Sequence, residues 1–118
     1  MRDWDLIREI LMRAAEKPPG QMLDANEVSG WDPLVVGAHI AMLHDANYVK
    51  AVMMRGHAIV TSAMVKEVTM QGYDLLDTLK SKTVWERIKV IAREKSIELS
   101  FDAIKTLGGL ALKQIVAE

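Results

Sequence analysis

The sequence predicts a mainly α-helical chain with one small β-hairpin. Apolar residues recur at helical spacing over most of the 118 residues, which is the pattern of amphipathic helices. One stretch differs, because two runs rich in β-branched residues flank a glycine-containing turn, as in an antiparallel hairpin. Half of the residues are hydrophobic and 26% are charged, a balance that excludes a mainly disordered chain.

The first helix begins close to the first residue of the chain and is followed by a loop. Asp3 or Asp5 supplies a side-chain cap, and Pro18-Pro19-Gly20 ends the helix because proline cannot continue it. No clear helical periodicity follows before Trp31, so an intermediate helix is expected to be weak or missing there. The expected apolar anchors of this loop are Met22, Leu23 and Val28.

A second helix and the hairpin come next. Asp32 supplies a cap and Pro33 a first-turn proline for a helix that runs to about Ala46, and Asn47 suits a left-handed stop. This helix is apolar on more than one side, so we expect it to be well packed. The two strands of the hairpin are expected at residues 48–54 and 58–65.

Three helices are expected after the hairpin. Thr69 caps the third helix of the chain, Thr83 begins the fourth and Ser100 caps the fifth. The order helix, loop, helix, hairpin, helix is that of a winged-helix domain, which we assign to residues 1–79. Residues 80–118 are expected to form a two-helix extension packed on this domain as part of a single compact unit.

Five short motifs, spread along nearly the whole chain, occur in a defined order and spacing. They are Asp3 to Leu11, His39-Ile40-x-x-Leu43-x-x-Ala46-x-Tyr48-Val49, Thr69-x-x-Gly72-x-x-x-Leu76-Asp77, Thr83-Val84-Trp85 and Ser100-x-x-x-Ile104-x-x-Leu107. In this arrangement the chain resembles the small bacterial and phage proteins grouped as domain of unknown function 2513. The resemblance implies a winged-helix-like fold with a C-terminal helical pair and frequent residence in prophages. It implies no catalytic residues, since none is assigned in that family.

The formal net charge of −1 excludes an all-over basic coat, but the charge is unevenly spread. From Pro18 to Val49 there are four acids and no Lys or Arg. This span includes the helix that would enter the major groove in a winged-helix DNA reader, so it is a poor face for phosphates. Between Lys80 and Lys95, six Lys and Arg stand against two Glu, which indicates either a nucleic-acid face or a solvated helix face.

Any nucleic-acid contacts are therefore expected on the wing and on the basic helix. Arg55 at the tip of the wing is a candidate for insertion into a minor groove, and the alternative is an ordinary exposed arginine. The candidate residues are Lys50, Arg55, His57 and Lys66 in the wing and Lys82, Arg87, Lys89 and Arg93 in the extension.

No catalytic, metal or cofactor site is expected. The chain has no cysteine, and His39 and His44 are separated by a helical rotation of about 140°, which is unsuited to chelation. We interpret His39 as a packed or hydrogen-bonded residue near the hairpin. No serine lies in a nucleophile elbow, and no glycine-rich phosphate loop follows a strand.

A cytoplasmic location without membrane insertion is expected. Acidic residues and a tryptophan stand where a secretory signal would need a basic start and an apolar core. The longest strongly apolar stretch, residues 33–44, is shorter than the roughly 20 residues that cross a bilayer.

The adjacent glycines Gly108 and Gly109 stand inside the last helix, where each costs about 1 kcal/mol relative to alanine. They indicate either a break in the helix or the close approach of another backbone, in a homodimer or where the helix is wedged into its own core. The residues predicted at a homodimer interface are Gly108, Gly109, Leu112 and Val116.

Two classes of non-enzymatic function fit these observations. The first is a phage- or prophage-associated regulator that binds duplex DNA through the wing and the basic helix. The second is a module that binds a host or phage protein and keeps the winged-helix scaffold without its DNA face. The fold favours the first class, whereas the distribution of charge favours the second.

Overall fold

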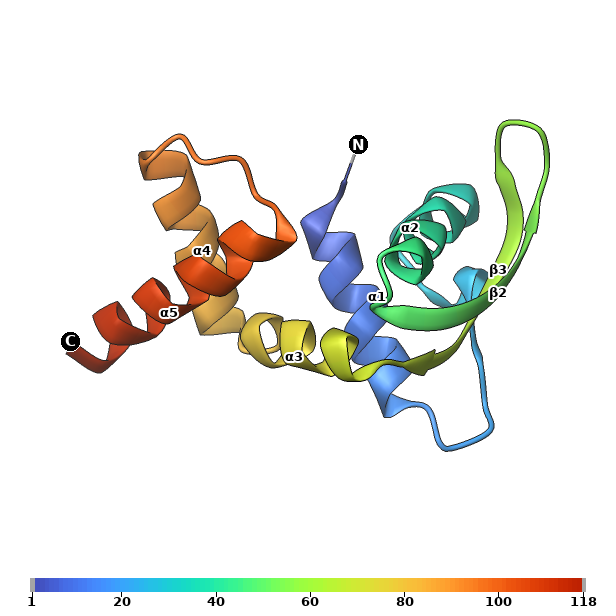
Figure 1. The fold of residues 1–118 in the computed structure, drawn as a ribbon, viewed down its shortest axis with the longest axis horizontal. Coiled ribbons are helices and arrows are strands. Elements are labelled where there is room, and N and C mark those ends of the chain that lie inside the picture. The colour runs from blue at the N-terminus through green and yellow to red at the C-terminus, as the bar shows by residue number, and fades with distance from the viewer. Residues whose placement is uncertain (1, 118) are drawn as a thin grey trace. The chain divides into compact units, whose positions relative to one another are not determined.

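The structure is a computed structural model that describes residues 2–117 (Figure 1). It is mainly α-helical with a small antiparallel sheet, which confirms the predicted fold class. The chain divides into two compact units, Met1–Tyr73 and Asp74–Glu118, called unit 1 and unit 2 below. A domain boundary after residue 79 and the packing of an extension on the first domain stay predictions. No helix within residues 2–117 has both the length and the apolar character needed to span a membrane.

Unit 1 combines helices with a three-stranded antiparallel sheet, and its assignment as a winged-helix domain stays a prediction. The three strands lie in the order β1-β3-β2, with both pairs antiparallel, and the hairpin β2–β3 is called the wing below. In chain order the elements are α1 (Trp4–Glu16), β1 (Leu23–Asp24), the 3-10 helix η1 (Ala25–Glu27), α2 (Pro33–Asp45), β2 (Val49–Arg55), β3 (Val60–Val68) and the first residues of α3 (Met70–Leu79).

Side-chain caps start the helices of unit 1 as the sequence predicts. Asp3, and not Asp5, is the cap of α1, because Asp3 Oδ1 accepts a hydrogen bond from Leu6 N–H at 3.0 Å. Asp32 caps α2 in the same manner. After α2, Asn47 has a φ of 66°, which confirms the predicted left-handed stop.

The segment between α1 and α2 holds a short strand, β1, that the sequence does not predict. Leu23 in β1 pairs with Val65 in β3, and the intermediate helix is reduced to the single turn η1. Leu23 and Val28 are buried as predicted. Met22 is exposed, contrary to the prediction, because neighbouring residues of an extended chain point to opposite sides.

The wing is longer and its turn is shifted relative to the prediction. β3 continues to Val68, and the turn takes residues 56–59, closed by a 2.8 Å hydrogen bond from Gly56 N–H to the Ile59 carbonyl. Arg55 pairs with Val60 and is the last residue of β2. His57 therefore lies in the turn, whereas Arg55 precedes it.

The start of α3 lies against the chain that follows α2. Thr69 Oγ1 donates a hydrogen bond of 2.6 Å to the Asn47 carbonyl and accepts one of 3.0 Å from Gly72 N–H. Thr69 N–H also donates to the Tyr48 carbonyl at 3.1 Å. A Cβ atom on Gly72 would collide with that carbonyl oxygen, so only glycine fits here. This contact gives a physical reason for the Thr69-x-x-Gly72 motif.

Unit 2 contains the rest of α3, then α4 (Lys82–Glu94) and α5 (Phe101–Ala117). Ser81 is the cap of α4, accepting from Val84 N–H at 3.3 Å, so this helix begins just before the predicted Thr83. Ser100 Oγ accepts from Ala103 N–H at 3.1 Å, as expected of the predicted cap. The buried side chains of α4 and α5 are Val84, Trp85, Ile88, Ile91, Ala92, Ile104, Leu107 and Ala111.

Candidate functional site

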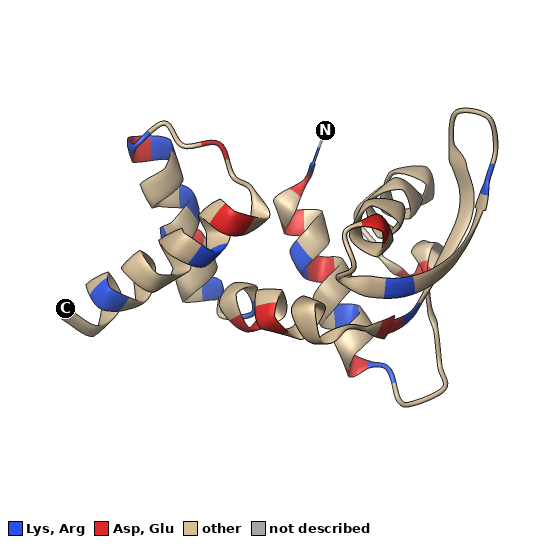
Figure 2. Cartoon of the chain, viewed as in Figure 1, with Lys and Arg blue, Asp and Glu red and all other residues tan. Residues whose placement is uncertain are grey.

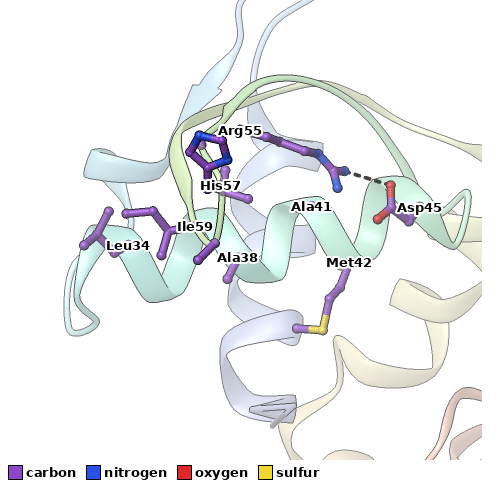
Figure 3. Close-up of a pocket in the computed structure, with 11 residues that line it drawn as sticks. Leu34, Ala38, Ala41, Met42, Asp45, Arg55, His57 and Ile59 are labelled. Carbon is purple, nitrogen blue, oxygen red and sulfur yellow. Dashed lines mark hydrogen bonds and ion pairs between the residues drawn. The ribbon is translucent and has the colours of Figure 1, made fainter.

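A groove of about 490 Å³ lies between α2 and the turn of the wing (Figure 3). We call it the α2–wing groove. Leu34 and Ile59 line one end of it, and both side chains are half exposed, at 50% and 55%. Toward the other end, Arg55 reaches from the end of β2 to Asp45 (Figure 3). The full lining is Leu34, Ala38, Ala41, Met42, Asp45, Arg55, Gly56, His57, Ala58, Ile59 and Val60.

The apolar character of α2 on more than one side explains the groove. One side is buried, with Val36, Ile40 and Leu43 inaccessible to solvent. A Cβ atom added to Gly37 of this helix would lie 3.7 Å from Val60 of β3, at ordinary van der Waals distance. The other side carries Leu34, which is exposed, so the helix is packed on one side only. The expectation that α2 is well packed is therefore wrong for its outer side.

The charged side chains that line the groove are few, and two of them, Asp45 and Arg55, are paired with each other. The helix α2 carries no Lys or Arg, and it has Asp32 as its cap and Asp45 as its last residue (Figure 2). The carboxylate of Asp45 is paired with Arg55, whose Nη2 lies 2.9 Å from Oδ1. This arginine, the predicted wing contact to DNA, is thus paired with an acid of the same unit.

The four predicted nucleic-acid residues of the wing do not form one patch of unpaired cations. Arg55 and His57 line the α2–wing groove, whereas Lys50 and Lys66 do not. Lys50 Nζ lies 3.2 Å from Glu67 Oε1 on the neighbouring strand. The side chains of His57 and Lys66 are exposed and make no hydrogen bond or ion pair with any residue between 2 and 117.

The four candidates in unit 2 all lie on α4. Lys82 and Arg93 are exposed and form no ion pair within the described part of the chain. Lys89 Nζ lies 3.1 Å from Glu86 Oε1 and 5.2 Å from the ring centroid of Trp85, which is buried as predicted. Arg87 donates a hydrogen bond of 3.2 Å to Gln114 of α5. Two of these four cationic side chains, Lys89 and Arg87, therefore already interact with residues of unit 2.

His39 is buried and fully hydrogen-bonded, which confirms that it is a packed residue. Its Nε2 accepts from Asp3 N–H at 2.9 Å, and its Nδ1 lies 2.8 Å from the Val35 carbonyl, to which it donates. His39 thus contacts the start of α1, and His44 is the histidine at the hairpin, accepting from Ala51 N–H at 3.2 Å. Within residues 2–117 no three His, Asp or Glu side chains are grouped to hold a metal ion.

The two glycines of α5 have different surroundings. A Cβ atom on Gly108 would lie 2.6 Å from the Thr78 methyl carbon of α3, so this glycine permits close contact within unit 2. A Cβ atom on Gly109 would meet nothing within 4 Å. Leu112 and Val116 are exposed at 53% and 81%, and their part in a homodimer stays a prediction.

Comparison with known proteins finds relatives whose activity is undescribed. A family model described as "Hypothetical protein (DUF2513)" matches residues 1–98. An "Uncharacterized protein" of Haemophilus influenzae (strain ATCC 51907 / DSM 11121 / KW20 / Rd) is 32% identical over 118 residues, which is 98% of this chain and 98% of that protein. No solved structure matches.

Proposed function

Since the chain belongs to the DUF2513 family, which is described only as hypothetical proteins, we propose a function from the geometry of its surface. The protein is a non-enzymatic interaction module that binds another protein through the α2–wing groove. Its cytoplasmic location and its association with phages or prophages stay predictions.

The outer side of α2 is the observation that carries this proposal. In a winged-helix DNA reader this helix would present cations and hydrogen-bonding groups to phosphates and base edges. Here it presents Leu34 and Ala38 beside Ile59 of the wing, with no Lys or Arg on the helix. An exposed apolar surface next to a concave wall is typical of a protein-binding site.

The ion pairs of the wing also favour protein binding over DNA binding. Most non-specific affinity for DNA comes from neutralising phosphates with cations. Arg55 and Lys50 already lie beside Asp45 and Glu67, so a phosphate would have to compete with these carboxylates.

The test compares a groove variant with a matched surface variant. Ala38→Glu places a charge in the groove at an exposed helical position, and Met54→Glu places one on the wing at a residue outside the groove. Proteins retained from host lysate by the wild type and by Met54→Glu, but lost with Ala38→Glu, are the expected result. Retention by all three proteins contradicts a function of the groove.

Nucleic-acid binding by α4 is the second candidate, and Lys82 and Arg93 favour it because both are exposed and unpaired within residues 2–117. Binding of labelled duplex DNA across a salt series tests it. The affinity should fall steeply with salt, and Arg93→Glu should flatten the slope by about one unit while Arg55→Ala leaves it unchanged. Absence of binding at about 50 mM salt contradicts this candidate.

A further inference from the structure

Two hydrogen bonds and a helix cap meet at Asp3, at the start of α1. Its N–H donates to His39 Nε2 at 2.9 Å, and its Oδ2 accepts from Trp31 Nε1 at 2.9 Å. Its Oδ1 is the cap of α1. We call Asp3, Trp31 and His39 the Asp3 cluster. Since both contacts run through Asp3, the cluster holds together the start of α1, the loop before α2 and α2 itself.

The hydrogen bonds of His39 require a neutral imidazole. Its Nε2 faces the Asp3 N–H and accepts, whereas its Nδ1 faces the Val35 carbonyl at 2.8 Å and donates. A protonated ring carries a donor on both nitrogens, so its Nε2–H would face the Asp3 N–H with no acceptor between them. The ring is only 4% exposed, so solvent does not replace the lost bond while the cluster stays closed. Protonation of His39 therefore requires the Asp3 cluster to open.

The charged groups near α2 do not offer the protonated ring a ready partner. No hydrogen bond or ion pair joins His39 to a charged side chain within residues 2–117. Both carboxylate oxygens of Asp3 are engaged already, by Leu6 N–H and Trp31 Nε1. A cationic ring would have to displace one of these two donors. Ion-paired charges on the elements packed against α2 have their partners elsewhere: Arg13 of α1 with Glu9, Glu27 of η1 with Lys17, Arg55 of β2 with Asp45, and Lys50 of β2 with Glu67 of β3.

We propose that the Asp3 cluster is a proton-operated switch, in which protonation of His39 releases Trp31 and the start of α1. The open form binds one proton more than the closed form, so a fall in pH favours opening. The closed form is favoured at neutral pH and above, and it is lost as the pH falls through the range in which histidine becomes charged, between about pH 8 and 5. In the lower part of this range, each pH unit favours opening by up to about tenfold. The inference is independent of what the α2–wing groove binds.

Nuclear magnetic resonance of the full chain labelled with nitrogen-15 tests the switch. At neutral pH the ring nitrogens of His39 should show the neutral form with its proton on Nδ1. Hydrogen exchange of the Trp31 indole N–H reports the opening, as a protection factor relative to an unstructured peptide. This factor should fall by about tenfold or more between about pH 7.5 and 5.5. The indole of Trp85, which is buried in unit 2, is the internal control and should lose much less protection.

A variant that does not titrate separates His39 from other groups. Glutamine offers one acceptor and one donor, as neutral histidine does, but it takes up no proton in this range of pH. In His39→Gln the protection of the Trp31 indole should be independent of pH. His44→Gln is the matched control, because His44 also lies on α2 but accepts from Ala51 N–H at the hairpin. This control should open with falling pH as the wild type does.

Three outcomes overturn the proposal. The first is a His39 ring that is charged at neutral pH or carries its single proton on Nε2. The second is a protection factor of Trp31 that does not fall with pH. The third is a fall that His39→Gln retains. If His39→Gln fails to fold, the wild type decides, because the loss of protection must follow the protonation of His39 in the same titration, and opening at a different pH overturns the switch.

Discussion

Asp3 and His39 are joined by a 2.9 Å hydrogen bond across 36 residues, from the backbone N–H of the first to the Nε2 of the second. The same aspartate caps α1 through Oδ1 and accepts a 2.9 Å hydrogen bond from Trp31 Nε1 through Oδ2. One residue thus ties the start of α1 to α2 and to the loop before it. This hydrogen bond holds Trp31, a loop residue whose position the helical periodicity does not predict.

Replacing His39 with alanine should lower the free energy of unfolding by about 2–4 kcal/mol. The substitution leaves the Asp3 N–H and the Val35 carbonyl without their partner and opens a cavity at a residue that is 4% exposed. Urea titration followed by circular dichroism measures the change. His57→Ala is the matched control, since His57 is exposed and should change stability by less than about 0.5 kcal/mol. Equal effects of the two substitutions would contradict a structural role for His39.

Gly72→Ala should destabilise the protein by about 3 kcal/mol, because the new methyl group would collide with the Tyr48 carbonyl. Gly37→Ala is the control within the same unit. Its Cβ would lie 3.7 Å from Val60, an ordinary contact, and alanine is the better helix former. Thermal unfolding should show a large decrease in Tm for the first variant alone. A tolerated Gly72→Ala would mean that α3 does not approach Tyr48 this closely.

The adjacent glycines of α5 should respond to alanine with opposite signs. Gly108→Ala should lower stability by about 1–3 kcal/mol, since the methyl group meets Thr78. Gly109→Ala should raise it by about 0.5–1 kcal/mol, because alanine favours the helix and the space is open. Unfolding of both variants at low protein concentration gives the comparison. The same sign for both would show that Thr78 does not constrain α5.

Ser81→Ala should cost about 1 kcal/mol through loss of the cap of α4. Thr83→Ala should cost less than about 0.5 kcal/mol, because Thr83 is exposed inside the first turn. Chemical denaturation of the two variants compares the contributions of Ser81 and Thr83 to the free energy of unfolding. A larger loss of stability with Thr83→Ala than with Ser81→Ala would indicate that the helix begins at Thr83, as the sequence predicts.

The surroundings of the outer side of α2 follow only in part from the sequence. The absence of Lys and Arg from this helix is readable in the sequence and already argues against a DNA face. The pairing of Arg55 with Asp45 is not readable, because it depends on how far the wing bends over α2. The sequence predicts Arg55 at the tip of the wing, whereas in the structure Arg55 is the last residue of β2 and lies beside Asp45.

By itself, the sequence determined the helix starts at Asp32 and Ser100, the left-handed turn at Asn47 and the existence of the hairpin, and it narrowed the cap of the first helix to Asp3 or Asp5. These features depend on residues a few positions apart, so periodicity and capping rules suffice for them. Only the tertiary structure decided that Leu23 is a strand residue, because its hydrogen-bonding partner in β3 lies far along the chain. It also decided that the outer side of α2 stays open as a groove, since packing between distant elements settles which of two apolar sides is buried.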